Sequence, residues 1–397
     1  MDIVIFSLIR HDAPISSTPL AIAKVFSKQH RVFYIDHPYS IKDVLKEEGL
    51  KGLLRRRWNE HKKHIEMYAV EHEGHTFWAI KPWMTIPINS LAPGNLYNRL
   101  SWYNDTRMNR FLDALYTQHE IKDQVFINAM DPWFFRRFFK KNVPLRRVYY
   151  TLDDISEVEY TSKHGVALER EKCRVADVVF ATSTELVKLM RVNREEVHLL
   201  PNAVDFDLFH RATNPNIQRP KEFEGIDKPI IAYVGHLDYR VDPEILFSIL
   251  KNHPDKYLVV VGPESWPKED FERLKTFKNF LFVGPKKIDQ LPNYLAFTSV
   301  GIIPFLLTKV TKSIYPLKVN EYLAAGVPVV ATPFSGDMEL FSDLVPQTTD
   351  SLQFCDYIQK EIDTDSSEKK ELRFKRAQEN TWTKRVKEFW DVLGLKS

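Results

Sequence analysis

The stretch that decides the fold is Ser313-Ile-Tyr-Pro-Leu-Lys-Val-Asn-Glu-Tyr-Leu-Ala-Ala-Gly326-Val-Pro-Val-Val-Ala331. Its first part predicts a helix, because Pro316 suits a first helical turn and Gly326 suits the position just past the last turn. The apolar run after Gly326 is typical of a buried parallel strand. A helix that leads directly into such a strand is the repeating unit of an α/β sheet.

The same alternation extends over most of the chain. Short runs rich in Val, Ile, Phe and Tyr alternate with amphipathic stretches of helix length, which predicts parallel sheets with crossover helices. The predicted strands are 2–8, 31–36, 124–129, 147–152, 177–182 and 196–201 in the first half, and 229–235, 256–262, 280–284, 299–304 and 327–332 in the second. The polar segment 205–228 contains Pro215 and Pro220, and we interpret it as a linker.

These elements predict two doubly wound, Rossmann-like α/β domains of similar size, residues 1–205 and 206–375, that face each other across a cleft. Ligands bind beyond the carboxyl ends of parallel strands, so such a cleft is a natural site. Residues 376–397 are predicted to form a C-terminal helix with Trp382, Phe389 and Trp390. These aromatics need a buried surface, either on the N-terminal domain or on the domain that precedes them.

Composition narrows the class of protein. The chain has 397 residues, of which 44% are apolar and 27% charged, values that are typical of soluble globular proteins of two or three domains. The net charge of +3 does not indicate a nucleic-acid partner. Cys173 and Cys355 form no metal-binding or disulfide pattern, which fits a reducing cytoplasm.

The N-terminus lacks the basic region of a signal peptide. The longest uncharged run, 290–308, contains prolines and is better explained by a helix and a strand than by a membrane span.

The position of the glycines excludes two nucleotide-binding classes. No glycine precedes Gly49, so the first strand-turn-helix carries neither a dinucleotide fingerprint nor a P-loop. Any phosphate site must therefore lie elsewhere in the chain.

Lys318 and Glu321 are the first candidates for ligand contact. They are three residues apart on the predicted helix and therefore share one face near its N-terminus. A lysine there opposes the helix dipole, and a bound diphosphate would remove that conflict. Glu321 can accept hydrogen bonds from two vicinal ribose hydroxyls. The alternative is a solvated surface pair without a ligand.

A second candidate is the loop that follows the strand at 229–235. Gly235 would let a ligand approach the backbone, while His236 and Arg240 can reach phosphate oxygens. Asp242 is the predicted N-cap of the next helix, and Pro243 its first residue. The alternative is an ordinary solvated loop.

Candidate acid–base residues follow two strands of the N-terminal half. Asp153 and Asp154 come after the buried strand at 147–152, and His11 follows the first strand. Any of the three can serve as a general base if its surroundings let it accept a proton. The alternative for the carboxylates is a helix cap or a loop contact.

Two stretches combine aromatic and basic residues. The first is Arg55-Arg56-Arg57-Trp58 with Lys62 and Lys63, and the second is 133–141, Trp-Phe-Phe-Arg-Arg-Phe-Phe-Lys-Lys. This composition suits the surface of an anionic membrane. The alternative is an amphipathic helix whose aromatics pack on the sheet.

The C-terminal half resembles the group 1 glycosyltransferases, the two-domain GT-B class that includes glycosyltransferase family 4. The resemblance is strongest to bacterial sugar transferases of the exopolysaccharide and teichuronic-acid type, and it extends over about 150–345. Its motifs are Tyr150-Thr-Leu-Asp-Asp, Glu169-Arg-Glu, Ala176-Asp-Val-Val-Phe-Ala-Thr-Ser, Leu200-Pro-Asn-Ala-Val-Asp, Tyr233-Val-Gly-His-Leu, Val260-Val-Gly-Pro, Phe282-Val-Gly-Pro, Leu291-Pro-Asn-Tyr-Leu, Ile303-Pro-Phe and Pro316 to Thr332.

The resemblance implies a nucleotide-sugar donor on the C-terminal domain and an acceptor on the N-terminal one. Glu321 would then bind the ribose and Lys318 the diphosphate, while Lys286 and Lys287 lie where backbone groups contact the base. Three positions depart from the family pattern. Ser313 stands where a second Glu is common, His236 stands where an Arg is usual, and Asp153 stands where many relatives have a His.

The sequence thus predicts a metal-independent glycosyltransferase of cell-surface polysaccharide biosynthesis, acting in the cytoplasm, peripherally at the inner face of the plasma membrane. Its donor would be a UDP- or GDP-linked sugar, bound as substrate, with no further cofactor. The acceptor would be a saccharide, which can be lipid-linked. Two alternatives remain open at this point: a nucleotide-sugar epimerase of the same fold, and a non-catalytic donor-binding subunit of a membrane assembly complex.

Overall fold

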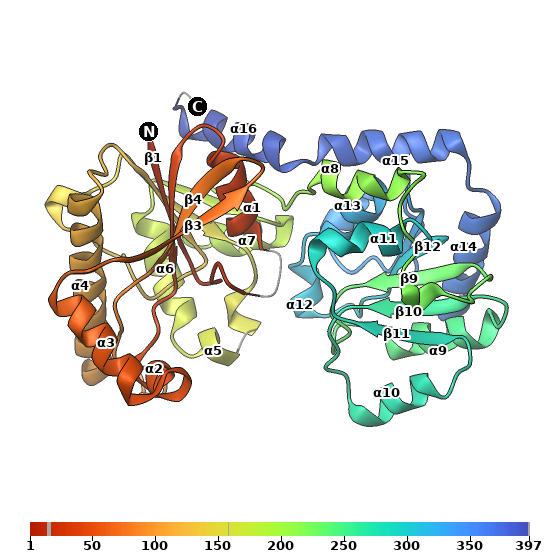
Figure 1. Ribbon diagram of the computed structural model, residues 1–397, viewed down its shortest axis with the longest axis horizontal. Coiled ribbons are helices and arrows are strands. Elements are labelled where there is room, and N and C mark those ends of the chain that lie inside the picture. Colours follow the sequence, from red (N-terminus) through yellow and green to blue (C-terminus); the bar gives the residue numbers. More distant parts are fainter. Residues whose placement is uncertain (14–16, 158, 396–397) are drawn as a thin grey trace. The chain divides into compact units, whose positions relative to one another are not determined.

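The chain forms two compact units in the computed structural model, which describes residues 1–13, 17–157 and 159–395 (Figure 1). The N-terminal unit comprises residues 1–200 together with 386–397, and the C-terminal unit comprises 201–385. The domain boundary expected after residue 205 lies shortly beyond this division.

The N-terminal unit is built on one mixed sheet. In the described part of the chain its strand order is β3-β4-β2-β1-β5-β6-β7-β8. The strands are β1 (Asp2–Ser7), β2 (Arg31–Asp36), β3 (Glu66–His72), β4 (His75–Lys81), β5 (Val125–Ala129), β6 (Arg146–Thr151), β7 (Val178–Ala181) and β8 (His198–Leu199). β1 pairs in parallel with β2 on one side and with β5 on the other, so the strand order reverses at β1. This reversal is the switch point at which doubly wound sheets bind ligands.

The hairpin β3–β4 corrects the expectation of a sheet that is parallel throughout. β4 pairs in parallel with β2, but β3 pairs with β4 in antiparallel register. No residue of the edge strand β3 is buried, and its sequence alternates polar with apolar residues. It therefore lacks the continuous apolar run that is typical of buried strands. Neither β3 nor β4 was among the predicted strands.

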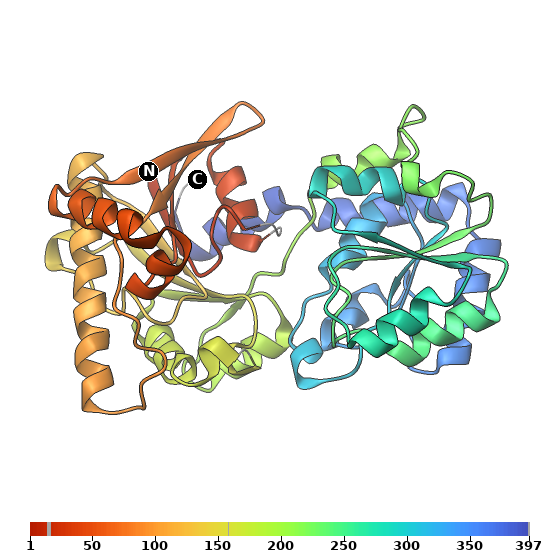
Figure 2. The same ribbon diagram turned by 60° about the horizontal axis from the view of Figure 1, so that its bottom comes forward.

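Helices and one aromatic segment complete this unit. The helices are α1 (Thr18–Phe26), α2 (Ile41–Glu47), α3 (Gly49–His61), α4 (Asn95–Gln118), α5 (Glu159–Ser162), α6 (Gly165–Val175) and α7 (Thr184–Arg191), with single turns η1 (Lys140–Asn142) and η2 (Ile155–Glu157). Figure 2 shows α3 beside the long α4, and an ion pair between Glu60 and Arg107 joins them. The aromatic stretch at 133–141 forms no α-helix, and its residues Trp133, Phe134 and Phe135 are buried in the core instead of facing solvent. Its membrane interpretation is therefore wrong.

The C-terminal unit contains a fully parallel sheet of order β11-β10-β9-β12-β13 in the described residues. The strands are β9 (Ile230–Val234), β10 (Tyr257–Val261), β11 (Phe280–Gly284), β12 (Val300–Ile303) and β13 (Val329–Ala331). Its strand order reverses at β9, so the carboxyl end of β9 is the switch point of this unit. Every predicted strand segment of both units overlaps an observed strand.

Helices lie on both faces of this sheet, with α9 and α10 on one and α11 and α13 on the other (Figure 1). The elements are α8 (Phe206–His210), α9 (Pro243–Asn252), α10 (Lys268–Lys275), α11 (Leu291–Leu295), α12 (Lys309–Lys312), α13 (Leu317–Ala324), α14 (Ser351–Asp363) and α15 (Ser367–Glu379), with single turns or short 3-10 helices η3 (Arg211–Thr213), η4 (Lys221–Phe223), η5 (Ile288–Gln290) and η6 (Gly336–Phe341).

The segment 205–228 is not a linker, which corrects the sequence interpretation. It folds as α8, η3 and η4 within the C-terminal unit. Phe209 and Phe223 anchor it, because both are buried in the core of that unit. The segment was interpreted as a linker because most of its residues are polar, and the two buried phenylalanines were not taken into account.

The last helix, α16 (Trp382–Leu393), begins in the C-terminal unit and ends in the N-terminal unit. Phe389 and Trp390 pack on Phe26 of α1, with ring centroids 5.3 and 5.5 Å apart. Phe389 also stacks on Phe180 of β7. None of the helices in the described residues is both long enough and apolar enough to span a membrane.

Candidate functional site

The carboxyl end of β9 and the N-terminus of α13 meet through Gly235 and Lys318. Gly235 has a positive φ of 154°, and a Cβ atom there would lie 2.2 Å from Cε of Lys318. A larger residue at this position would require the end of the Lys318 side chain to move. The approach of a ligand to the Gly235 backbone stays a prediction.

Lys318 is a half-buried cation whose side chain contacts an aromatic ring in the described residues. Burial lowers the pKa of its ammonium group, while the nearby carboxylate of Glu321 opposes that shift. Its Nζ lies 5.6 Å from the ring centroid of Phe305. Among the described residues none forms a hydrogen bond or ion pair with this ammonium group.

Glu321 lies one turn further along α13 and is also half-buried. Burial raises the pKa of its carboxyl group to about 7, and Lys318 opposes that shift. Its side chain accepts no hydrogen bond from the part of the chain that the structure describes. Both groups are thus partly withdrawn from water and form no hydrogen bond within the described residues, which is typical of residues that bind a polar ligand.

Tyr322 holds α13 against the sheet. Its hydroxyl accepts a hydrogen bond from the amide of Val234 at 2.8 Å and donates to the carbonyl of Ala232 at 3.3 Å. Its ring covers Gly301 of β12, where a Cβ atom would lie 2.9 Å away. The helix ends as expected, with Gly326 just past its last turn at φ 77°. These contacts fix Lys318 and Glu321 at the switch point of the sheet.

The loop after Gly235 contains an ion pair that the sequence analysis missed. Arg240 donates from Nε to Asp238 Oδ1 at 2.9 Å and from a terminal nitrogen to Oδ2 at 2.5 Å. Burial would raise the pKa of Asp238, but the bonds from Arg240 prevail and lower it. His236 lies beside them, with Nε2 2.9 Å from Oγ of Ser265. Asp242 caps α9 as expected.

The remaining C-terminal candidates do not join this group by direct contact. Nζ of Lys286 lies 2.6 Å from Oε1 of Glu222 on η4, and Lys287 is exposed. Ser313 is 2% exposed, and its hydroxyl donates to the carbonyl of Val310 at 2.8 Å. This hydroxyl is thus used inside the fold.

In the N-terminal unit the three acid–base candidates follow two strands that are separated by β5. Asp153, after β6, is exposed. Asp154 accepts hydrogen bonds from the amide and hydroxyl of Ser156 at 3.0 and 2.6 Å, which makes it a turn-capping residue. His11, after β1, has Nδ1 2.7 Å from Oδ2 of the fully buried Asp36.

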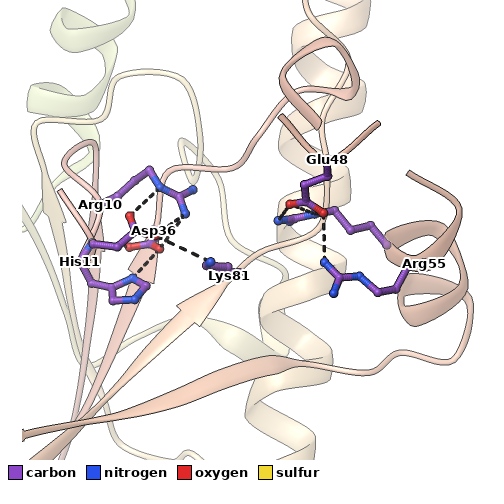
Figure 3. A network of polar contacts seen from close by, with 8 residues as sticks. Arg10, His11, Asp36, Glu48, Arg55 and Lys81 are labelled. Carbon is purple, nitrogen blue, oxygen red and sulfur yellow. Dashed lines mark hydrogen bonds and ion pairs between the residues drawn. The ribbon is translucent and has the colours of Figure 1, made fainter. Parts of the chain in front are cut away.

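His11 belongs to a network of charges at the ends of β1 and β2 (Figure 3). His11, Asp12 and Asp36 have the mutual spacing of metal ligands in the described residues. Arg10, however, lies 3.1 Å from Asp12 and 3.6 Å from Asp36, and Lys81 lies 3.7 Å from Asp12. These two cations balance the charge of both carboxylates.

Comparison with known proteins assigns the C-terminal unit to a family. Residues 228–360 match the family model described as "Glycosyl transferases group 1". The C-terminal unit carries a group 1 glycosyltransferase domain. The matched residues run from just before β9 into α14, so the group 1 domain includes Gly235, Arg240, Lys318 and Glu321. The recognition made from the sequence motifs is confirmed.

Two relatives extend this likeness. TuaH of Bacillus subtilis (strain 168), assigned to glycosyl transfer in teichuronic acid biosynthesis, is 25% identical over 218 residues, which cover 53% of this chain and 54% of TuaH. The D-inositol 3-phosphate glycosyltransferase of Xylanimonas cellulosilytica is 22% identical over 253 residues, which cover 58% of each chain. The chain thus spans about half the length of the curated relatives that it matches.

Solved structures show that the whole chain has the GT-B fold. The α,α-trehalose-phosphate synthase of Burkholderia xenovorans matches with a TM-score of 0.68 and 12% identity, over 99% of this chain and 100% of that one. The sucrose-phosphate synthase of Thermosynechococcus elongatus matches with a TM-score of 0.65 and 15% identity, over 99% and 98%. The group 1 domain is therefore the C-terminal part of a GT-B architecture, as predicted.

Proposed function

We propose that this chain transfers a sugar from a nucleoside diphosphate sugar to an acceptor hydroxyl. The observation that carries the proposal is the pair Lys318 and Glu321, held unpaired at the switch point of the group 1 domain. A ligand with an anionic part and a pair of vicinal hydroxyls satisfies both side chains at once. A ribonucleoside diphosphate has both.

Lys318 would bind the diphosphate near the N-terminus of α13, and Glu321 would bind the ribose hydroxyls. As the bond from the anomeric carbon to the diphosphate breaks, negative charge grows on the leaving oxygen. A fixed cation there stabilises that charge without a metal ion. Arg240 would add to the local field, although Asp238 already balances most of its charge. We propose a UDP- or GDP-linked sugar as the donor.

The N-terminal unit would bind the acceptor, and Asp153 would take the proton of its hydroxyl. Asp153 is favoured over Asp154, whose carboxylate caps η2. The likeness to TuaH supports an acceptor in cell-surface polysaccharide biosynthesis. The buried thiols Cys173 and Cys355 are unpaired and lie in different units, which supports a reducing cytoplasm as the place of action.

A screen of nucleotide sugars tests the proposal. UDP- and GDP-sugars should raise the melting temperature of the protein, and the free nucleoside diphosphate should compete with the one selected. Turnover of that donor should then depend on an added saccharide. A chain that binds none of these nucleotides would refute the proposed function, and conversion of the donor alone to an isomer would indicate an epimerase.

We further propose that α3 attaches the protein to an anionic membrane. Leu50, Leu54 and Trp58 are spaced by four residues, so they form one apolar stripe, and all three side chains are more than half exposed. The exposed basic residues Lys51, Arg55, Arg57, Lys62 and Lys63 surround the stripe. Anionic lipid satisfies both features.

The structure changes which arginine belongs to this surface. Arg56 is buried, and a terminal nitrogen of its guanidinium lies 2.5 Å from Oε1 of Glu48. Arg55 also contacts Glu48 but keeps most of its side chain exposed (Figure 3). Arg56 therefore supports the fold, and a test must leave it in place.

Co-sedimentation with vesicles tests this attachment. Anionic vesicles should retain the protein, neutral ones should not, and Arg55→Ser with Arg57→Ser should release it at low salt, because each basic residue contributes about 1 kcal/mol. Trp58→Ser should weaken the binding that persists at high salt. Lys251→Ala, an exposed lysine on α9, is the control. If the double variant sediments like the wild type, α3 is an ordinary solvated helix.

A further inference from the structure

A second histidine–aspartate pair lies at the carboxyl edge of the N-terminal sheet. His37 follows β2 directly and Asp131 follows β5, the two strands that flank β1. Nδ1 of His37 lies 2.5 Å from Oδ2 of Asp131. The pair thus bridges the switch point of this unit, where doubly wound sheets bind ligands.

Asp131 fixes the orientation of the imidazole. Its side chain is fully buried, and Oδ1 accepts hydrogen bonds from the amides of Trp133 and Phe134 at 2.9 and 3.3 Å. An ionised carboxylate can only accept, so the ring proton of His37 is placed on Nδ1. Nε2 is then an acceptor with its lone pair directed away from Asp131.

Nε2 of His37 is available to a ligand. The side chain keeps 18% of its surface exposed, and no residue in the described part of the chain forms a hydrogen bond with Nε2. Three aromatic rings surround the imidazole, those of Trp133 and Phe134 at 5.6 Å and that of Tyr160 at 6.5 Å between centroids. Tyr160 packs on Trp133 at 5.1 Å and is itself 53% exposed.

His11 has a similar pair but different surroundings. Its partner Asp36 also lies 3.6 Å from Arg10, and the adjoining Asp12 is paired with Arg10 and Lys81. A dense set of charges therefore surrounds His11. His37 instead combines one oriented polar atom with an aromatic surface, a combination that suits a ligand with both C–H faces and hydroxyl groups.

We infer that His37 binds a sugar of the acceptor. Nε2 accepts a hydrogen bond from one of its hydroxyls, and the exposed ring of Tyr160 contacts its apolar face. Asp131 is a positioning residue that holds the imidazole in the accepting form. This inference rests on the proposed function, because it assigns the saccharide that receives the transferred group to a particular place in the N-terminal unit.

Nitrogen NMR of the full chain tests the site without knowledge of the natural acceptor. The protein is labelled with ¹⁵N-histidine and titrated with the methyl glycosides of glucose, galactose and N-acetylglucosamine. The signals of His37 are those absent from His37→Gln. We expect a protonated Nδ1, an unprotonated Nε2, and a shift of Nε2 with at least one glycoside, while exposed His64 stays unchanged.

Two variants sharpen the result. Asp131→Asn should move the ring proton to Nε2 and abolish the shift, because the amide can donate to Nδ1. Tyr160→Ala, at an exposed position, should weaken glycoside binding roughly 2- to 10-fold without a change of fold. A His37 signal that none of the three glycosides moves would overturn the inference, as would an unprotonated Nδ1 in the wild type.

Nucleotide binding by the group 1 domain is measured in the same samples. If His37 does not respond while nucleotide sugars still bind, only the acceptor site is wrong. If the wild type binds no nucleotide sugar, the proposed function itself has failed, whatever His37 does.

Discussion

The carboxyl edges of the two sheets both carry buried or half-buried ionisable side chains. These side chains are paired at one edge and lack hydrogen-bonded partners at the other. In the N-terminal unit, the buried carboxylates Asp36 and Asp131 each bind a histidine within 2.7 Å. In the C-terminal unit, Lys318 and Glu321 have no hydrogen-bonded partner among the described residues. At the first edge the buried carboxylates are paired within the fold, whereas at the second edge Lys318 and Glu321 form no hydrogen bond or ion pair within the described residues.

This difference shows how a binding residue can be recognised in a fold. An isolated buried charge costs several kcal/mol, so a protein retains one only where something compensates for it. The compensation at Asp36 and Asp131 is visible in the structure. At Lys318 and Glu321 burial lowers the pKa of the lysine and raises that of the glutamate, and no hydrogen bond from the described residues compensates either group.

The largest expected effect concerns the N-terminal edge. Asp153→Asn should reduce sugar transfer by roughly 10²- to 10⁴-fold, because a general base contributes that much, while donor affinity stays within a few-fold. Initial rates and nucleotide titrations measure the two quantities. Asp154→Asn is the matched control, because the amide oxygen of Asn can still accept the hydrogen bonds from Ser156, so stability and rate should both change little. Equal losses of rate in both variants would remove the distinction between them.

The next largest effect is expected for Lys318→Ala. Loss of a charge-assisted hydrogen bond costs about 1.5–3 kcal/mol, so nucleoside diphosphate affinity should fall about 10- to 150-fold. The affinity for the nucleoside without phosphate should change little. Calorimetric titration with both ligands gives the comparison, and Lys251→Ala serves as the control. A similar loss for both ligands would contradict the role of Lys318 in phosphate binding.

We expect Glu321 to have a smaller effect, a dependence of nucleoside affinity on pH. Burial raises the pKa of Glu321 to about 7, and only the ionised carboxylate can accept bonds from both ribose hydroxyls. Binding therefore lowers that pKa, and nucleoside affinity should increase as pH rises towards about 7 and level off above it. The 2′-deoxy nucleoside and the Glu321→Gln variant should both lack this rise. If the variant loses affinity for both nucleosides equally, Glu321 is structural.

The smallest effect is on stability. The pKa of Glu321 in the folded chain is about 7, above the ordinary value of 4.5. Protonation of this carboxyl group therefore favours the folded state. The resulting stabilisation is complete below pH 4.5 and is lost as the pH rises to about 7. Glu321→Gln should therefore stabilise the protein by roughly 1–3 kcal/mol at pH 8 and hardly at pH 5. The lost attraction to Lys318 offsets part of the gain. Thermal unfolding at both pH values measures whether Glu321→Gln stabilises or destabilises the protein. The substitution would be destabilising at pH 8 if the free protein held Glu321 in a salt bridge.

Most strands were predicted from the sequence because each is a continuous apolar run. The hairpin β3–β4 was missed: β3 lies at an edge and alternates polar with apolar residues, and β4 begins and ends with polar residues. It also placed Lys318 and Glu321 on one helical face, since spacing along a helix is local information. The contact of Lys318 with Gly235 was not predictable, because the two residues approach only after the sheet has formed.

The same reason explains the other omissions in the candidate site. Asp238 precedes Arg240 by two residues, and this spacing was a signal that could have been used. His37 gave no such signal, since its partner Asp131 is distant in sequence and is brought near only by the order of β2, β1 and β5. Pairings across a sheet depend on topology, which periodicity alone does not specify.

The path of α16 has a consequence for the order in which the units complete folding. Residues 1–200 leave the ribosome first and begin to fold as they emerge, but 386–397 of the same unit are made only after residues 201–385. Phe26 and Phe180 therefore lack their contacts with Phe389 and Trp390 until the C-terminal unit has been synthesised. The N-terminal unit thus begins to fold before the C-terminal unit but completes its aromatic packing only after that unit has been made.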